Sequence, residues 1–296
     1  MTNVTIPNIA DACMLAYCSI SVWSARKLDK KQTQKTITAA GATNDAARVN
    51  KHLLANADAA LKEVQRKANQ IRDYIDTNTV PWDDAGNRLL PNARALVVVG
   101  KLRDLEVEFD KTVDDFVAQY PVLRAQAVAN LGDMGEDSDY PQPDVVRSKF
   151  SIKVSFSPVP KDFGDVRVGM SEKAAVAWQQ HYEGNVQRQV GDALRAAWGR
   201  LRESLERYSD RLQLDEEKGK TKVFRDTMVS QLRETVDLLA SLNVFGDATL
   251  ERLTREVRER IAGFDAEVLR SNVGVAMSVK QSTDEILSKL HSTLGQ

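Results

Sequence analysis

Three histidines are the side chains in this chain best suited to metal binding or acid–base catalysis. They are His52, His181 and His291. No two are four residues apart, as two zinc ligands on one helix turn would be, and none lies beside a cysteine. His181 could act as a general base, but such a base needs a partner that positions the imidazole. We therefore predict no metal site and no cofactor, and we expect the chain not to be an enzyme.

The two cysteines, Cys13 and Cys18, predict free thiols. Two cysteines five residues apart cannot form a disulfide framework, and they cannot supply the four ligands of a structural zinc. A free cysteine packs as a small apolar side chain, so we expect both to be buried. The start of the chain lacks the pattern of a signal peptide, and no apolar run approaches the ~18 to 20 residues of a membrane span. We expect a soluble protein of the cytoplasm, with no membrane partner.

Acidic residues gather in the sequence LGDMGEDSDYPQP, residues 131–143. They are Asp133, Glu136, Asp137 and Asp139. Their spacing lacks the alternating acids, central glycine and terminal glutamate of an EF-hand loop. We interpret the segment as a solvated linker.

A basic stretch near the start raises the question of nucleic acid. Its residues are Trp23, Arg26, Lys27, Lys30, Lys31 and Lys35. The cations could follow a phosphate backbone while the indole stacks on a base. The competing interpretation is a helix end whose lysines meet acids of the same chain, because basic residues dominate 26–72 and acidic residues dominate 73–144. A net charge of -1 gives no global argument for nucleic acid.

Helical spacing of apolar residues dominates the rest of the chain. One stripe predicts an amphipathic helix from Asp45 to Asp76, and the next helix carries a seam like that of a coiled coil. The seam residues are Val98, Leu102, Leu105, Phe109, Val113, Phe116 and Tyr120. Further stripes over 178–212, 229–239 and 250–268 predict a helical bundle. Segment 272–281 fits a strand or a helix, and its flanks favour helix, with Ser282 and Glu285 spaced as a capping box.

Alternating residues replace the helical spacing only in the centre of the chain. The apolar members are Phe150, Ile152, Val154 and Phe156, followed by a second alternation at Val166 and Val168. Prolines frame the segment, so it predicts a β-hairpin with a long loop. An isolated hairpin is marginal in water and must lie on helices or pair with another chain.

The predicted fold is mainly α, with long amphipathic helices in coiled-coil-like hairpins or a bundle and one central β-hairpin. Three consecutive regions follow from these patterns. Residues 1–130 form an N-terminal helical hairpin region, 131–170 the linker and β-hairpin, and 171–296 a C-terminal helical bundle.

The run FVAQYPVLRAQAVANLGDMGEDSDYPQPDVVRSKFSIKVSFSPVPKDF, with ISVWSARKL near the start, resembles an uncharacterised family of bacteriophage and prophage proteins, a domain of unknown function. The matching residues are Phe116, Tyr120, Tyr140, Pro141, Phe150, Pro158, Val159, Pro160, Asp162 and Phe163. The chain departs from the family pattern by inserting Gly-Asp-Val between Phe163 and Arg167. The resemblance implies no catalytic residue. It also implies genes that lie near those of ring-forming AAA ATPases, and hence an accessory role in the host cytoplasm.

The leading hypothesis is a non-enzymatic, phage-encoded interaction protein that forms homo-oligomers or binds a host or phage protein, as an adaptor, scaffold or counter-defence factor. An exposed hairpin edge would offer backbone groups for strand addition. The residues expected to contact a partner are Tyr140, Pro141, Phe150, Phe156, Pro158, Pro160, Asp162 and Phe163. The alternatives are a nucleic-acid-binding protein that uses residues 23–35, and an accessory subunit of an AAA ATPase system.

Overall fold

The computed structural model describes residues 6–160, 172–215, 220–221, 226–243 and 248–294. Helices make up most of these residues, which confirms the mainly α fold. The chain divides into two compact units. Unit 1 comprises Met1–Tyr17, Asp76–Val97 and Ser155–Gln296, and unit 2 comprises Cys18–Ile75 and Val98–Val154.

The two units are interleaved in sequence, which differs from the three consecutive regions predicted. The unit boundaries fall inside two strands and two helices, β1 (Cys13–Ser21), α3 (Ala59–Asn78), α4 (Asn92–Leu131) and β6 (Ser151–Pro158). Composition shifts mark linkers, but they do not show where a continuous helix changes its packing partners.

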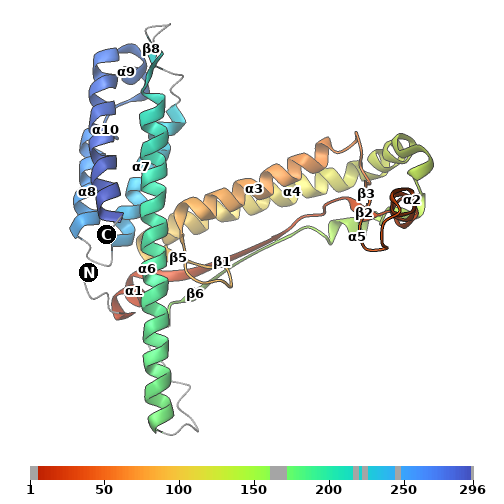
Figure 1. Ribbon diagram of the computed structural model, residues 1–296, viewed down its shortest axis with the longest axis horizontal. Helices are drawn as coiled ribbons and strands as arrows, with labels where there is room; N and C mark the ends of the chain where they lie inside the picture. The colour runs from red at the N-terminus through yellow and green to blue at the C-terminus, as the bar shows by residue number, and fades with distance from the viewer. Residues whose placement is uncertain (1–5, 161–171, 216–219, 222–225, 244–247, 295–296) are drawn as a thin grey trace. The chain divides into compact units, whose positions relative to one another are not determined.

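Unit 1 contains a helical bundle. Its helices are α6 (Glu172–Arg211), α7 (Asp226–Leu242), α8 (Ala248–Arg260), α9 (Ala266–Ser271) and α10 (Val273–Leu294). Contacts run from α6 to α7, α7 to α8, α8 to α10 and α10 back to α6, so the four long helices close on one another (Figure 1). A short ribbon, β7 (Leu214–Asp215) with β8 (Lys220–Thr221), follows α6.

Most residues of the apolar stripes predicted for the bundle helices form its core, but Val268 is exposed, and the stripe over 250–268 is divided between α8 and α9. The buried members include Val190, Leu201, Leu205, Tyr208, Val229, Leu232, Val236, Leu239, Leu250, Leu253 and Val257. In segment 272–281 every residue after Asn272 belongs to α10, so the helix that the flanks favoured is confirmed. The capping box predicted at Ser282 and Glu285 is wrong, because both lie inside α10; the side chain of Asn272 instead accepts a hydrogen bond from the Val275 amide.

A four-stranded sheet lies beside α6, in the strand order β4-β5-β1-β6. Its two short strands are β4 (Val80–Pro81) and β5 (Asn87–Pro91), and α1 (Ile6–Ala12) precedes β1. β1 pairs antiparallel with β5, from Cys13 opposite Pro91 to Tyr17 opposite Asn87. The Arg200 guanidinium on α6 donates a hydrogen bond to the Thr79 carbonyl oxygen over 2.7 Å, which ties the helix to the start of β4.

The strand predicted as the first half of the central hairpin pairs with a strand from another part of the chain, within the residues that the structure describes. β6 contains the alternating segment, but its neighbour in the sheet is β1, from the start of the chain. The second alternation, at Val166 and Val168, lies outside the described residues. Pairing between distant segments leaves no local signal, so periodicity identified the strand but not its neighbour.

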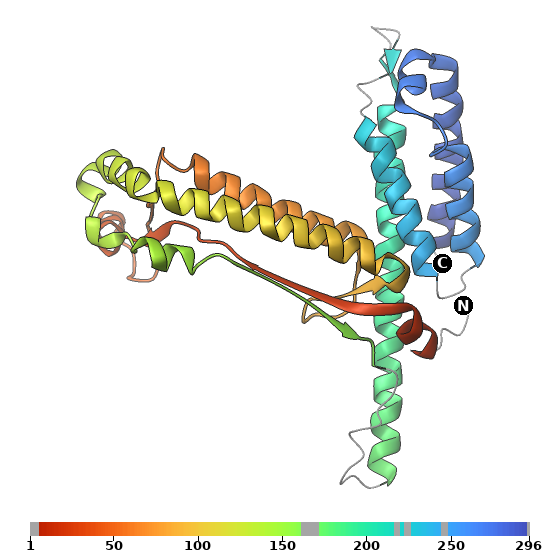
Figure 2. The same ribbon diagram turned by 180° about the vertical axis from the view of Figure 1, so that it is seen from behind.

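Unit 2 contains a hairpin of long helices. α3 and α4 lie side by side in both views (Figures 1 and 2), and the stripe predicted on α4 is buried at every one of its seven positions. The helix predicted from Asp45 begins only at Ala59. The prediction was wrong there because Asn56 takes the left-handed conformation, with φ 59°, which no α-helix continues through.

A group of short elements lies where α3 begins and α4 ends (Figure 1). We call it the head. It contains β2 (Arg26–Leu28), α2 (Lys30–Ala40), β3 (Asn50–His52), the 3-10 turns η1 (Gly132–Met134) and η2 (Asp137–Asp139), and α5 (Pro143–Arg147). Asp29 caps α2 by accepting a hydrogen bond from the Gln32 amide over 2.9 Å, and Gly41 ends it with φ 60°. Among the described helices of both units, none is long and apolar enough to cross a membrane.

Candidate functional site

The β2–β3 ribbon of the head has two chemically different faces. Arg26 lies opposite His52, Lys27 opposite Lys51, and Leu28 opposite Asn50. Successive side chains of a strand point to opposite faces. Lys27 and Lys51 therefore share one face, which we call the lysine face. The other face carries Arg26, Leu28, Asn50 and His52, and we call it the arginine face.

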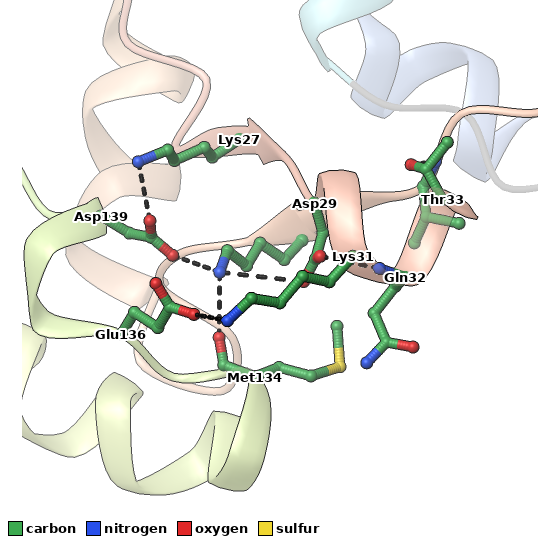
Figure 3. Close-up of polar contacts among 10 residues, drawn as sticks. Lys27, Asp29, Lys31, Gln32, Thr33, Met134, Glu136 and Asp139 are labelled. Atoms are coloured by element: carbon green, nitrogen blue, oxygen red, sulfur yellow. Dashed lines mark hydrogen bonds and ion pairs between the residues drawn. The ribbon is translucent and has the colours of Figure 1, made fainter. Parts of the chain in front are cut away.

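Asp139 is the centre of a charge cluster against the lysine face (Figure 3). Lys27 Nζ donates a hydrogen bond to Asp139 Oδ1 over 2.7 Å, and Lys51 forms an ion pair with the same carboxylate. Lys51 Nζ also donates to the Met134 carbonyl oxygen over 3.0 Å and lies 3.8 Å from Asp29 Oδ2. The side chains of Lys51 and Asp139 are only 6% and 7% exposed.

The charges in this cluster stabilise one another. Burial alone would raise the pKa of the Asp139 carboxyl, but hydrogen bonds from Lys27 and Lys51 hold that pKa below its ordinary value. The hydrogen bond to Asp139 raises the pKa of Lys51, against the opposing effect of burial. Both groups therefore stay ionised near neutral pH, and the pair ties the ribbon to the segment that follows α4.

A second, solvated pair extends the cluster. Lys31 Nζ on α2 lies 3.0 Å from Glu136 Oε1, with both side chains largely exposed (Figure 3). A surface pair of this kind contributes little stability. Three lysines of the head thus meet acids of residues 136–139, which is the arrangement that the competing interpretation of the basic stretch described.

Trp23 does not fit the nucleic-acid hypothesis. Its ring is 8% exposed and packs against Phe116 at 6.4 Å and, edge to face, against Tyr120 at 5.8 Å between ring centroids. An indole packed in this way cannot stack on a base, so the role predicted for it needs correction. Arg26, Lys30 and Lys35 are the exposed cations of the stretch that form no ion pair within the described parts of the chain.

The residues predicted to contact a partner fall into two groups. Tyr140 and Phe150 are buried in unit 2, where Phe150 packs against Phe116, and the Tyr120 hydroxyl donates a hydrogen bond to the Pro141 carbonyl oxygen over 3.1 Å. The buried side chains of Tyr140 and Phe150 hold the fold and are not a docking surface, whereas Pro141 is half-buried and contributes its carbonyl oxygen. The second group is exposed and consists of Phe156, Pro158 and Pro160. Asp162 and Phe163 lie outside the described residues.

β6 is an edge strand of the sheet in the part of the chain that the structure describes. Its residues 155–158 are all exposed, and the Phe156 ring is 37% exposed. An edge strand carries a row of backbone donors and acceptors that face away from its one neighbour. The arrangement therefore offers both hydrogen-bonding groups and one aromatic side chain.

The other candidates for chemistry lie apart from one another. His181 lies at an exposed position of α6 and is hydrogen-bonded to Asn185, and His291 lies 3.7 Å from Glu206 Oε1. Cys13 is buried, and burial raises the pKa of its thiol to about 11, whereas Cys18 is only partly buried. No three His, Cys, Asp or Glu side chains that the structure describes are grouped so that they could hold a metal ion.

The sequence did not reveal a pocket that borders the arginine face. Its volume is about 530 Å³, and its lining residues are Ser24, Arg26, Asn50, His52, Asp58, Lys62 and Gln65. They come from the ribbon, from the start of α3 and from the residues just before β2 and α3. To predict this pocket from the sequence, one would need to know that Arg26 lies opposite His52. That pairing follows only once β2 and β3 are recognised as paired strands.

The chain matches no model of a protein family, and no curated protein or solved structure is significantly similar to it. The resemblance to the phage family therefore stays a prediction that depends on the quoted residues.

Proposed function

We propose that the chain is a non-enzymatic interaction protein that binds an extended segment of a partner protein along β6. The observation that carries the proposal is the exposed edge of this strand, with Phe156 beside the available backbone groups. An added strand gains affinity from main-chain hydrogen bonds and specificity from side-chain contacts. Pro158 has no backbone N–H, so it limits pairing at the end of the strand.

Binding to a different protein is favoured over assembly through the helices. Most described members of the apolar stripes that suggested coiled-coil assembly are buried inside their own unit, within unit 2 for α4 and within the bundle of unit 1 for the others. The buried residues of these stripes offer no apolar area to a second copy. We therefore propose an adaptor rather than a self-assembling scaffold, with phage origin and an AAA ATPase partner as predictions from the resemblance.

Site-specific photocrosslinking tests the proposal. The crosslinker p-benzoylphenylalanine replaces Phe156 in one variant and Met277 in the other, because Met277 is an exposed apolar residue on α10 of the same unit. In the cells that encode the protein, we expect a discrete crosslinked species from position 156 and none from position 277. The proposal fails if position 156 gives no product, or if both positions give the same products.

A further inference from the structure

We infer that the pocket beside the arginine face binds a small phosphorylated ligand of the sugar-phosphate class. This site is separate from partner binding at β6, because no residue of β6 lines the pocket. Its residues, its charge and its backbone conformation each contribute to the inference.

The geometry of two elements brings the lining side chains together. Arg26 and His52 are directly opposite in the antiparallel ribbon, so their side chains lie next to each other on one face, which they share with Asn50. On the helical side, Lys62 and Gln65 are three residues apart on α3, so they lie on one face of the helix. Asp58 lies four residues before Lys62. Ser24 precedes the ribbon and completes the lining.

The pocket carries more positive than negative charge. Asp58 is matched by Lys62, whose ammonium group lies 3.0 Å from the carboxylate. Arg26 then supplies an additional positive charge. Across the described chain, the side chains of Ser24, Arg26, Asn50, His52 and Gln65 make no hydrogen bond or ion pair. This contrasts with the lysine face of the same ribbon, where Lys27 and Lys51 are both paired with Asp139.

The backbone at the edge of the pocket is strained. Ala25 lies between the lining residues Ser24 and Arg26 and has φ 51°, a left-handed conformation that costs energy for a residue with a Cβ. Its methyl group is fully buried, and its carbonyl oxygen accepts a hydrogen bond from the Leu53 amide over 2.7 Å. Packing therefore holds the strained conformation. It also fixes the backbone positions from which the Ser24 and Arg26 side chains extend. Strain of this kind is concentrated at functional sites.

The composition of the lining indicates the class of ligand. A guanidinium group, a hydroxyl and side-chain amides are donors suited to phosphate oxygens. The Asp58 carboxylate is an acceptor suited to a sugar hydroxyl. No aliphatic residue lines the pocket and His52 is the single aromatic ring in its lining, so a nucleobase would find little apolar surface there. The pocket is open to solvent, and its volume of about 530 Å³ exceeds that needed by one phosphate ion.

Isothermal titration calorimetry on the full chain tests the inference. The probes are glucose 6-phosphate and ribose 5-phosphate, compared with glucose, inorganic phosphate and AMP. We expect at least one sugar phosphate to bind at least about tenfold more tightly than glucose, inorganic phosphate or AMP. Arg26→Gln should weaken this binding at least about tenfold, because the guanidinium is the unmatched cation. Lys30→Gln is the matched control and should leave it unchanged, since Lys30 is exposed on α2 and does not line the pocket.

Gln65→Glu gives a second variant that leaves the ribbon intact. It adds a negative charge on the helical side of the pocket, and we expect it to abolish sugar-phosphate binding while the circular dichroism melt stays the same. The inference is overturned if neither sugar phosphate binds at millimolar concentration, or if both pocket variants bind as the parent does. Tighter binding of AMP would also overturn it, and so would inorganic phosphate binding as tightly as the sugar phosphates. None of these outcomes depends on crosslinking from Phe156.

Discussion

Lys51 and Asp139 form an ion pair in which both side chains are almost completely buried, although they come from distant parts of the sequence. Burying two charges costs several kcal/mol of desolvation per ion, and only good geometry with further hydrogen bonds offsets it. Lys27 and the Met134 carbonyl oxygen supply those hydrogen bonds. The pair therefore acts as the connection between the β2–β3 ribbon and the segment after α4.

Replacing one member of the pair should destabilise unit 2 strongly. For Asp139→Asn we expect the free energy of unfolding to fall by about 3 kcal/mol, because the buried Lys51 loses its hydrogen-bonded carboxylate and keeps only the more distant Asp29, 3.8 Å away. Chemical denaturation followed by circular dichroism measures the change. Asp133→Asn is the control, since Asp133 is an exposed acid of the same linker, and it should change stability by less than about 0.5 kcal/mol. Equal effects of the two substitutions would contradict a structural role for the pair.

Acid should weaken the fold through the same carboxylate. The folded state lowers the pKa of Asp139 below its ordinary value of 3.8, so the unfolded chain binds a proton at a higher pH than the folded chain does. The stability from Asp139 is therefore present above the ordinary pKa and is lost as the pH falls through the lowered one. Between about pH 5 and about pH 3, the free energy of unfolding should fall more steeply for the parent than for Asp139→Asn. Parallel pH profiles would show that Asp139 is not the group responsible.

Trp23 should matter for stability and not for nucleic acid. Trp23→Ala removes a ring packed against Phe116 and Tyr120, and we expect a loss of about 3 to 5 kcal/mol in the free energy of unfolding. Leu28→Ala, at a 40% exposed position of the same region, should cost less than about 1 kcal/mol. Trp23→Phe should keep the fold and leave any retention on single-stranded DNA unchanged. A loss of retention in that variant would support the base-stacking role instead.

Two glycines of unit 2 should respond to alanine in opposite directions. A Cβ on Gly100 would meet no atom within 4 Å, so Gly100→Ala inside α4 should stabilise the protein by about 0.5 to 1 kcal/mol. A Cβ on Gly135 would clash with the Val128 carbonyl oxygen, and backbone cannot move aside as a flexible side chain can. Gly135→Ala should therefore destabilise by about 1 to 3 kcal/mol. Thermal melts of both variants measure the signs, and two shifts of the same sign would contradict this packing.

The helices were predictable because their signal is local. The spacing from Val98 to Tyr120 repeats over seven positions, and each of these residues is buried in unit 2. The same rule overextended the preceding helix, since Val49 and Leu53 fit helical spacing although Asn56 turns the chain before α3. Apolar spacing reports which face is buried, but it does not report a change of backbone conformation between stripes.

The candidate sites were less predictable because they depend on pairing between distant segments. The alternation at residues 150–156 predicted a strand, but nothing nearby in the sequence indicates β1 as its neighbour. Likewise, Arg26 and Lys27 look alike as neighbouring cations in the sequence. The ribbon separates them, so Lys27 pairs with Asp139 while Arg26 borders the pocket. Only the register of β2 with β3 distinguishes these two roles.

The central claim is that the apolar helical stripes are buried within one chain and that β6 binds a different protein. Light scattering on the purified chain across a concentration series tests it most directly. We expect a molar mass of 32.9 kDa at every concentration, because most described residues of the predicted helical stripes are buried within the chain. A stable multiple of that mass would contradict the claim and show that the protein assembles with itself.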